Sequence, residues 1–154
     1  MRHYLTAKTG DIPNVREVYE AFKQYARSPN AGGFEELVAD IRTHSGYYCA
    51  MALGAEQDPN LKLVFHDIRE LKVDVAFPLL LELYHDYVKG LLAKDEFVRA
   101  ARLVESYVFR RAVCSIPTNS MNKTFATFPR ALKKDRYLVF RSVSDVNDHG
   151  GRPS

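Results

Sequence analysis

Apolar side chains recur at steps of three and four residues along most of this 154-residue chain. That spacing matches the 3.6-residue period of an α-helix, whereas a half-buried β-strand alternates every second residue. The pattern predicts helices over roughly residues 15–27, 34–51, 59–71, 73–89, 95–114 and 119–128. We therefore expect an all-α fold, a single compact bundle of about six helices over residues 1–141 with a short polar C-terminal tail over residues 142–154.

Prolines and capping residues mark the expected ends of these helices. Pro13 and Pro59 suit the first turn of a helix, where a backbone N–H has no partner, and Asp58 can cap the helix that Pro59 opens. Pro78 must start or kink the fourth helix, because it cannot donate a hydrogen bond inside one. The apolar residues before Pro78 also suit a strand, but the helical spacing that follows favours a helix. Pro117 separates the last two helices.

Composition indicates a protein of the cytoplasm. The longest apolar stretch, Val75–Leu83, contains Pro78 and is far shorter than the roughly 20 residues that span a bilayer. The N-terminus has no basic stretch followed by an apolar signal core. Cys49 and Cys114 are far apart and lack a second metal-ligating residue at a suitable spacing, so we expect both to be reduced and buried.

Positive charge is concentrated in the second half of the chain. Residues 1–93 contain 10 Lys and Arg against 13 Asp and Glu, whereas residues 94–141 contain 11 against 4, a net charge of +7. A one-sided basic region suits either a polyanion such as DNA or an acidic protein domain. Its densest part is either a solvated helix end or a contact to the DNA backbone, and comprises Arg130, Lys133, Lys134, Arg136 and Arg141.

Two helix ends are expected to meet around Pro117. Arg110 and Arg111 fall at the end of one helix, where cations offset exposed carbonyl groups, although a guanidinium also suits phosphate or the carboxylate of a docked domain. Asn119, Asn122 and Lys123 open the next helix. The asparagines suit capping better than base recognition, and Lys123 can meet an anion near the free N–H groups of that helix.

No motif of a nucleotide-binding loop, zinc protease or serine hydrolase occurs in the sequence. His44, His66 and His85 each lie in a predicted helix near an acidic residue, a pattern more typical of surface or core-edge contacts than of catalysis. We therefore name no catalytic residue, no metal ligand and no cofactor.

Three segments resemble the helical region of the large bacterial family of GmrSD-type restriction proteins. The most specific is residues 110–123 (RRAVCSIPTNSMNK), which has ESYVF before it and is followed at residues 125–126 by FA. Residues 2–10 (RHYLTAKTG) and 73–81 (VDVAFPLLL) resemble the family in the same order. One departure is Ser115, where the family generally has glycine. If the backbone there has positive φ, serine adopts it at some cost.

The resemblance implies a fragment of a larger phage-defence protein. In full-length members this region lies between a ParB-like NTP-using domain and an HNH nuclease domain, and the family cleaves modified foreign DNA. Neither domain's motifs occur in this chain, so the resemblance implies a non-catalytic helical domain whose partners are those two neighbouring domains and, through a basic face, DNA. The alternative is a helical protein–protein interaction module that makes no nucleic-acid contact.

Overall fold

The computed structural model describes residues 1–72, 74–117 and 119–131, and every regular element in these residues is helical. The α-helices are α1 (Arg2–Thr9), α2 (Val18–Ala26), α3 (Phe34–Ala52), α4 (Pro59–Glu70), α5 (Phe77–Val88), α6 (Lys94–Val113) and α7 (Asn119–Ala131). Three single 3₁₀ turns precede α2, α3 and α5, namely η1 (Val15–Glu17), η2 (Pro29–Ala31) and η3 (Asp74–Ala76).

The predicted all-α class is confirmed, but the described residues form seven α-helices rather than about six. The additional helix is α1, whose residues Tyr4, Leu5, Thr6 and Ala7 are all buried. A helix buried on several sides has no single apolar stripe, so the periodicity that indicates amphipathic helices does not reveal it.

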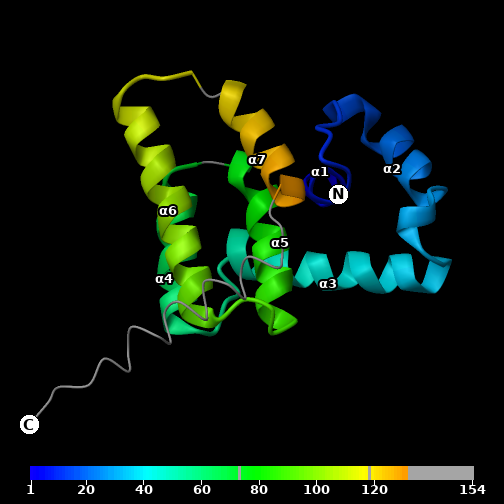
Figure 1. Ribbon diagram of the computed structural model, residues 1–154, viewed down its shortest axis with the longest axis horizontal. Helices are drawn as coiled ribbons and strands as arrows, with labels where there is room; N and C mark the ends of the chain where they lie inside the picture. The colour runs from blue at the N-terminus through cyan, green and yellow to red at the C-terminus, as the bar shows by residue number, and fades with distance from the viewer. Residues whose placement is uncertain (73, 118, 132–154) are drawn as a thin grey trace, which may run out of the picture.

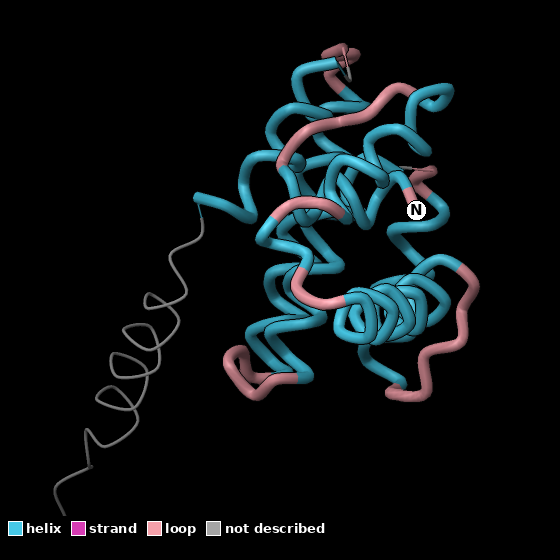
Figure 2. Tube along the Cα trace, turned by 90° about the vertical axis from the view of Figure 1, so that its right-hand side faces the viewer, coloured by secondary structure: helices cyan, strands magenta, loops and turns pink. Residues whose placement is uncertain are grey.

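Helix α5 lies at the centre of the fold and packs against α1, α3, α6 and α7. Figure 1 shows α6 beside α4, and α3 running sideways from α5 beneath α1. In Figure 2, turned by 90°, α3 is seen nearly end-on, so it crosses the others rather than lying parallel to them. The central position of α5 explains its nearly continuous apolar sequence, because neighbours cover almost all of its faces.

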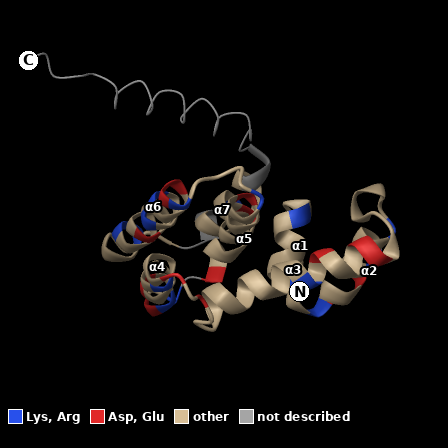
Figure 3. Ribbon diagram, turned by 90° about the horizontal axis from the view of Figure 1, so that it is seen from below, with Lys and Arg blue, Asp and Glu red and all other residues tan. Residues whose placement is uncertain are grey.

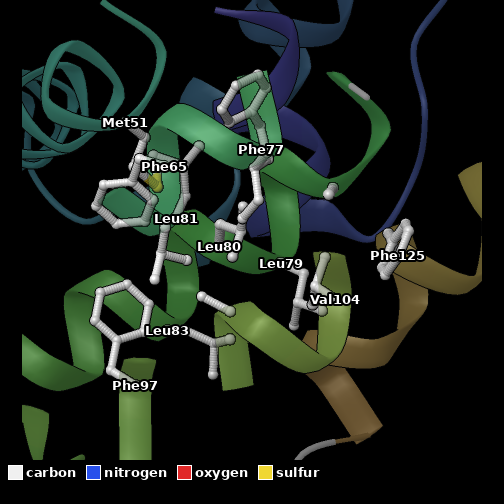
Figure 4. Close-up of a cluster of buried hydrophobic side chains, with 14 of the residues drawn as sticks. Met51, Phe65, Phe77, Leu79, Leu80, Leu81, Leu83, Phe97, Val104 and Phe125 are labelled. Carbon is white, nitrogen blue, oxygen red and sulfur yellow. The ribbon is translucent and has the colours of Figure 1, made fainter. Parts of the chain in front are cut away.

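The main core forms where α5 meets α3, α4, α6 and α7. Figure 4 shows side chains from these helices converging around the leucines of α5. Phe65 of α4 and Phe97 of α6 lie with ring centroids 5.9 Å apart, and both rings are buried. Fully burying one such side chain contributes about 1.5–3 kcal/mol. Tertiary packing rather than helix propensity therefore holds these elements together.

A smaller apolar cluster lies between α1, α2 and the start of α3. It consists of Tyr4, Leu5, Tyr25, Ala31 and Leu37. Helix α2 packs mainly on α1 and lies at the far side of the molecule from α6 (Figure 1).

Most predicted helix ends are confirmed. The Asp58 carboxylate accepts from the backbone N–H groups of Asn60 and Leu61, and Pro59 follows it as the first helical residue. Pro78 lies in the first turn of α5, so it starts that helix rather than kinking it. The expected first-turn role of Pro13 is wrong. Asn14 instead accepts from the N–H of Arg16 and opens η1 ahead of α2.

Within the described ranges, no helix combines the length and the apolar character that a membrane crossing requires. The expected polar tail over residues 142–154, together with Lys133 and Lys134, lies outside the described residues.

Candidate interaction surface at the α6–α7 junction

Helix α6 ends in a turn built around a residue with positive φ. The N–H of Ser115 donates to the carbonyl of Ala112, and the N–H of Ile116 donates to the carbonyl of Arg111. These two bonds form a Schellman motif, in which the residue after the C-cap adopts the left-handed conformation. That residue is Ser115, with φ of 52°. The position that suits glycine is therefore occupied by serine.

Arg111 is held within this junction. Its Nη2 donates to the carbonyl oxygen of Pro117 at 2.8 Å, and its Nη1 donates to the hydroxyl of Tyr107 at 3.2 Å. The guanidinium also lies over the Tyr107 ring, 5.6 Å from the centroid. Arg111 thus ties the last turn of α6 to the loop that follows it. This is the structural role among those expected from the sequence.

Arg110 has a different environment. Its guanidinium donates from Nε and Nη2 to the hydroxyl of Ser106, one turn earlier, and the side chain is exposed. Exposed apolar side chains accompany it along the same end of α6 and the following loop, namely Phe109, Val113 and Ile116. We call Phe109, Arg110, Val113 and Ile116 the α6 end surface. A cation among large apolar groups is a composition found at protein interfaces.

The remaining predicted contact residues are not gathered on this surface. Lys123 is exposed on the second turn of α7, but its neighbour Asn122 is half-buried and lines a pocket with Arg2 of α1 and Asp74 of η3. The backbones of Asn119 and Arg130 lie in α7, at its first and twelfth residues. The side chains of Asn119 and Arg130, like all of Lys133 and Lys134, lie outside what the structure describes.

Charges of both signs lie close together where α6 packs against α4, whereas the basic half has no acidic residue between Glu105 and the end of α7. Figure 3 shows Lys and Arg alternating with Asp and Glu on α4 and α6. Arg102 donates to Asp67 of α4 and to Glu105 of its own helix, each at 2.6 Å. The net positive charge counted in the sequence is therefore partly neutralised by ion pairs between helices.

Cys114 is exposed, so the expectation that both cysteines are buried is wrong for this residue. It forms the C-cap of α6, where the helix ends and leaves the core. Cys49 is half-buried, and both cysteines are free thiols.

A partly buried polar cluster connects α1 to α3, and the sequence revealed only its part within α3. The hydroxyl of Tyr4 donates to Oδ2 of Asp40 at 2.7 Å, and Nζ of Lys8 lies 3.0 Å from the same oxygen. Nδ1 of His44 lies 2.9 Å from the backbone oxygen of Asp40 and 3.2 Å from Oδ1. Because both neighbours of Nδ1 are acceptors, this nitrogen carries the proton of the neutral ring.

Burial and hydrogen bonding shift the pKa values in this cluster. Burial lowers the pKa of His44, because the ring is only 2% exposed and its charged form loses hydration. Burial alone would raise the pKa of Asp40, but hydrogen bonds from Tyr4 and Lys8 outweigh it, and the net shift is downward. The pKa of Tyr4 is raised by burial and by its bond to Asp40. The contact between Asp40 and His44 could be expected from the sequence, because the two residues are four apart in a helix. The contact between Asp40 and Tyr4 could not, because these residues are 36 positions apart.

The other predicted histidine contacts lie at the surface and at the edge of the core. His66 is exposed, with Nδ1 3.3 Å from Oδ1 of Asp67. The ring of His85 stacks on that of His44, with centroids 5.2 Å apart and planes inclined by 20°.

A buried acid, Glu56, orders the loop before α4. Its Oε1 accepts from the N–H groups of Gln57 and Asp58, and its Oε2 accepts from the hydroxyl of Tyr84 on α5. Burial and this hydrogen bond raise the pKa of Tyr84. Three donors thus compensate a carboxylate that is 7% exposed, as a buried acid requires.

Comparisons with known proteins do not assign this chain to a family. No protein-family model, no curated protein and no solved structure matches it.

Proposed function

We propose that this chain is a non-catalytic helical domain of a GmrSD-type restriction protein, which joins the NTP-using and nuclease domains by binding a neighbouring domain through the α6 end surface. The observation that carries the proposal is the exposure of Arg110 among Phe109, Val113 and Ile116, while the adjacent Arg111 is engaged inside the junction.

The chemistry of this surface favours a protein over nucleic acid. Arginine and aromatic residues provide much of the binding energy at protein interfaces, where burial of apolar surface accompanies each polar contact. Binding to a DNA backbone depends instead on several cations that each neutralise a phosphate. The α6 end surface has one cation and three apolar side chains. A domain that presents an acidic residue within an apolar patch complements it.

DNA contact is the second candidate function. It is supported by the net charge of +7 over residues 94–141 and by the exposed Lys123 near the start of α7. A protein that binds DNA chiefly through phosphates loses affinity steeply as salt increases.

Association assays test the first proposal. The full chain is mixed with separately expressed ParB-like and HNH domains of a GmrSD-type protein, and binding is measured by calorimetry. Charge reversal by Arg110→Glu should weaken binding at least about tenfold, as expected for a central interface arginine. The matched control is Arg16→Glu, which reverses an exposed charge in η1, directly before α2, and should leave the affinity unchanged. Helix α2 lies at the far side of the molecule from α6 (Figure 1).

Salt-titrated binding to duplex DNA separates the two functions. Under the first proposal, Arg110→Glu reduces domain binding and Lys123→Glu leaves it intact. If neither domain bound the unmodified chain, the first proposal would be refuted. Binding to DNA that weakens with salt and with Lys123→Glu would support the second.

A further inference from the structure

An apolar groove lies between α5, α6 and α7, away from the polar clusters described above. Its volume is about 350 Å³. Its floor is formed by Leu79 and Leu83 of α5 and by Val104 and Phe125, which Figure 4 shows on neighbouring helices. A cavity of about 150 Å³ holds one benzene-sized group, so this groove has room for about two large apolar side chains.

The rim of the groove is also apolar. Leu103 of α6 is 69% exposed, Phe128 of α7 is 45% exposed, and Tyr107, one turn after Leu103 on α6, also lines the groove. An exposed patch that continues into an apolar hollow is typical of a surface that binds another segment.

We infer that the groove receives the apolar segment Tyr137–Phe140 of the same chain. This run of four consecutive apolar residues, Tyr-Leu-Val-Phe, is the longest one that follows Phe128 in the sequence. Alternate side chains of an extended segment point the same way, so two of the four can enter the groove together. Two side chains are also about what the volume of the groove can hold.

The segment lies within reach of the groove. Helix α7 ends at Ala131, three residues after the rim residue Phe128, which is about 4.5 Å along the helix axis. Five residues, 132–136, connect Ala131 to Tyr137, and an extended chain of that length spans about 17 Å.

Covalent connection favours this segment over a second copy of the protein. A connection of a few residues gives an effective concentration on the order of millimolar, whereas another molecule in a micromolar solution is about a thousand times more dilute. The inference does not depend on the proposed function, because the groove and the α6 end surface involve different side chains.

Tryptophan fluorescence of the full chain tests the inference without background, because the chain contains no tryptophan. Phe140→Trp places the reporter in the segment, and Val146→Trp places a control reporter further along. If the segment occupies the groove two thirds of the time, the tryptophan at position 140 is accessible to acrylamide in one third of the molecules. Its quenching constant should therefore be about threefold lower than that of the tryptophan at position 146. Its emission should also lie at shorter wavelength.

One variant at the groove rim and one matched control elsewhere show whether the groove causes the protection. Leu103→Glu adds a charge at the rim and should remove the protection of the tryptophan at position 140. Leu63→Glu changes an exposed leucine on α4, outside the groove, and should preserve the protection. Both residues are exposed, so the helical circular dichroism signal should be retained, and Tyr137→Trp provides a second reporter.

Three results would overturn the inference. The first is equal quenching of the tryptophans at positions 140 and 146, and the second is protection that persists in Leu103→Glu. The third is protection lost on dilution, which would identify a second copy of the protein as the occupant of the groove.

Discussion

Replacing Ser115 by glycine should stabilise this protein, although the change removes a side chain. Ser115 has φ of 52°, in the left-handed region that costs a non-glycine residue about 1–2 kcal/mol. Glycine adopts this conformation without that cost. Glycine also loses more conformational entropy on folding, which lowers the free energy of unfolding by about 0.5–1 kcal/mol. The difference predicts that Ser115→Gly increases the free energy of unfolding by about 0.5–1 kcal/mol.

Urea unfolding followed by circular dichroism measures this change, and thermal unfolding should show a midpoint about 1–4 °C higher. Ser115→Ala retains the strain and removes only the exposed hydroxyl, so its free energy of unfolding should stay within about 0.5 kcal/mol of the parent.

Ser45→Gly provides the opposite control. Ser45 is exposed inside α3, where glycine is unfavourable, so this variant should lose about 0.5–1 kcal/mol. If Ser115→Gly destabilised the protein as Ser45→Gly does, the explanation of the α6 terminus by a strained left-handed serine would be wrong.

Three further predictions concern the core, the junction and the buried histidine. Phe97→Ala removes a ring that is 0% exposed and should lower the free energy of unfolding by about 3–5 kcal/mol, whereas Phe34→Ala, at 82% exposed, should change it by less than about 0.5 kcal/mol in the same urea assay. Arg111→Met should cost about 1 kcal/mol through loss of its bonds at the junction, and an equal cost for Arg110→Met would contradict the structural role of Arg111. Because burial lowers the pKa of His44 below 6.5, its stabilising contribution is complete above pH 6.5 and is lost as pH falls further. The urea midpoint should therefore decrease from pH 7 to pH 5, and His44→Gln should make that decrease smaller, leaving the part due to His3, whose pKa burial also lowers.

The sequence alone was sufficient for the fold class and for most helix ends. These depend on local interactions: the 3.6-residue spacing of apolar side chains, the Asp58 cap and the missing N–H of Pro78 act within one or two turns. The exception is α1, because its burial comes from neighbours on several sides and leaves no periodic stripe.

Tertiary structure decided which of two adjacent, chemically similar residues is engaged in contacts and which is exposed. Arg110 and Arg111 are equivalent in the sequence, but the backbone turn at Ser115 brings the carbonyl of Pro117 to Arg111 and leaves Arg110 at the surface. Asn122 and Lys123 are likewise separated, because successive residues of a helix point in directions about 100° apart. The groove between α5, α6 and α7 is lined by side chains from all three helices, so it exists only when they pack together. The spacing of residues within one segment does not determine which surfaces of distant segments meet.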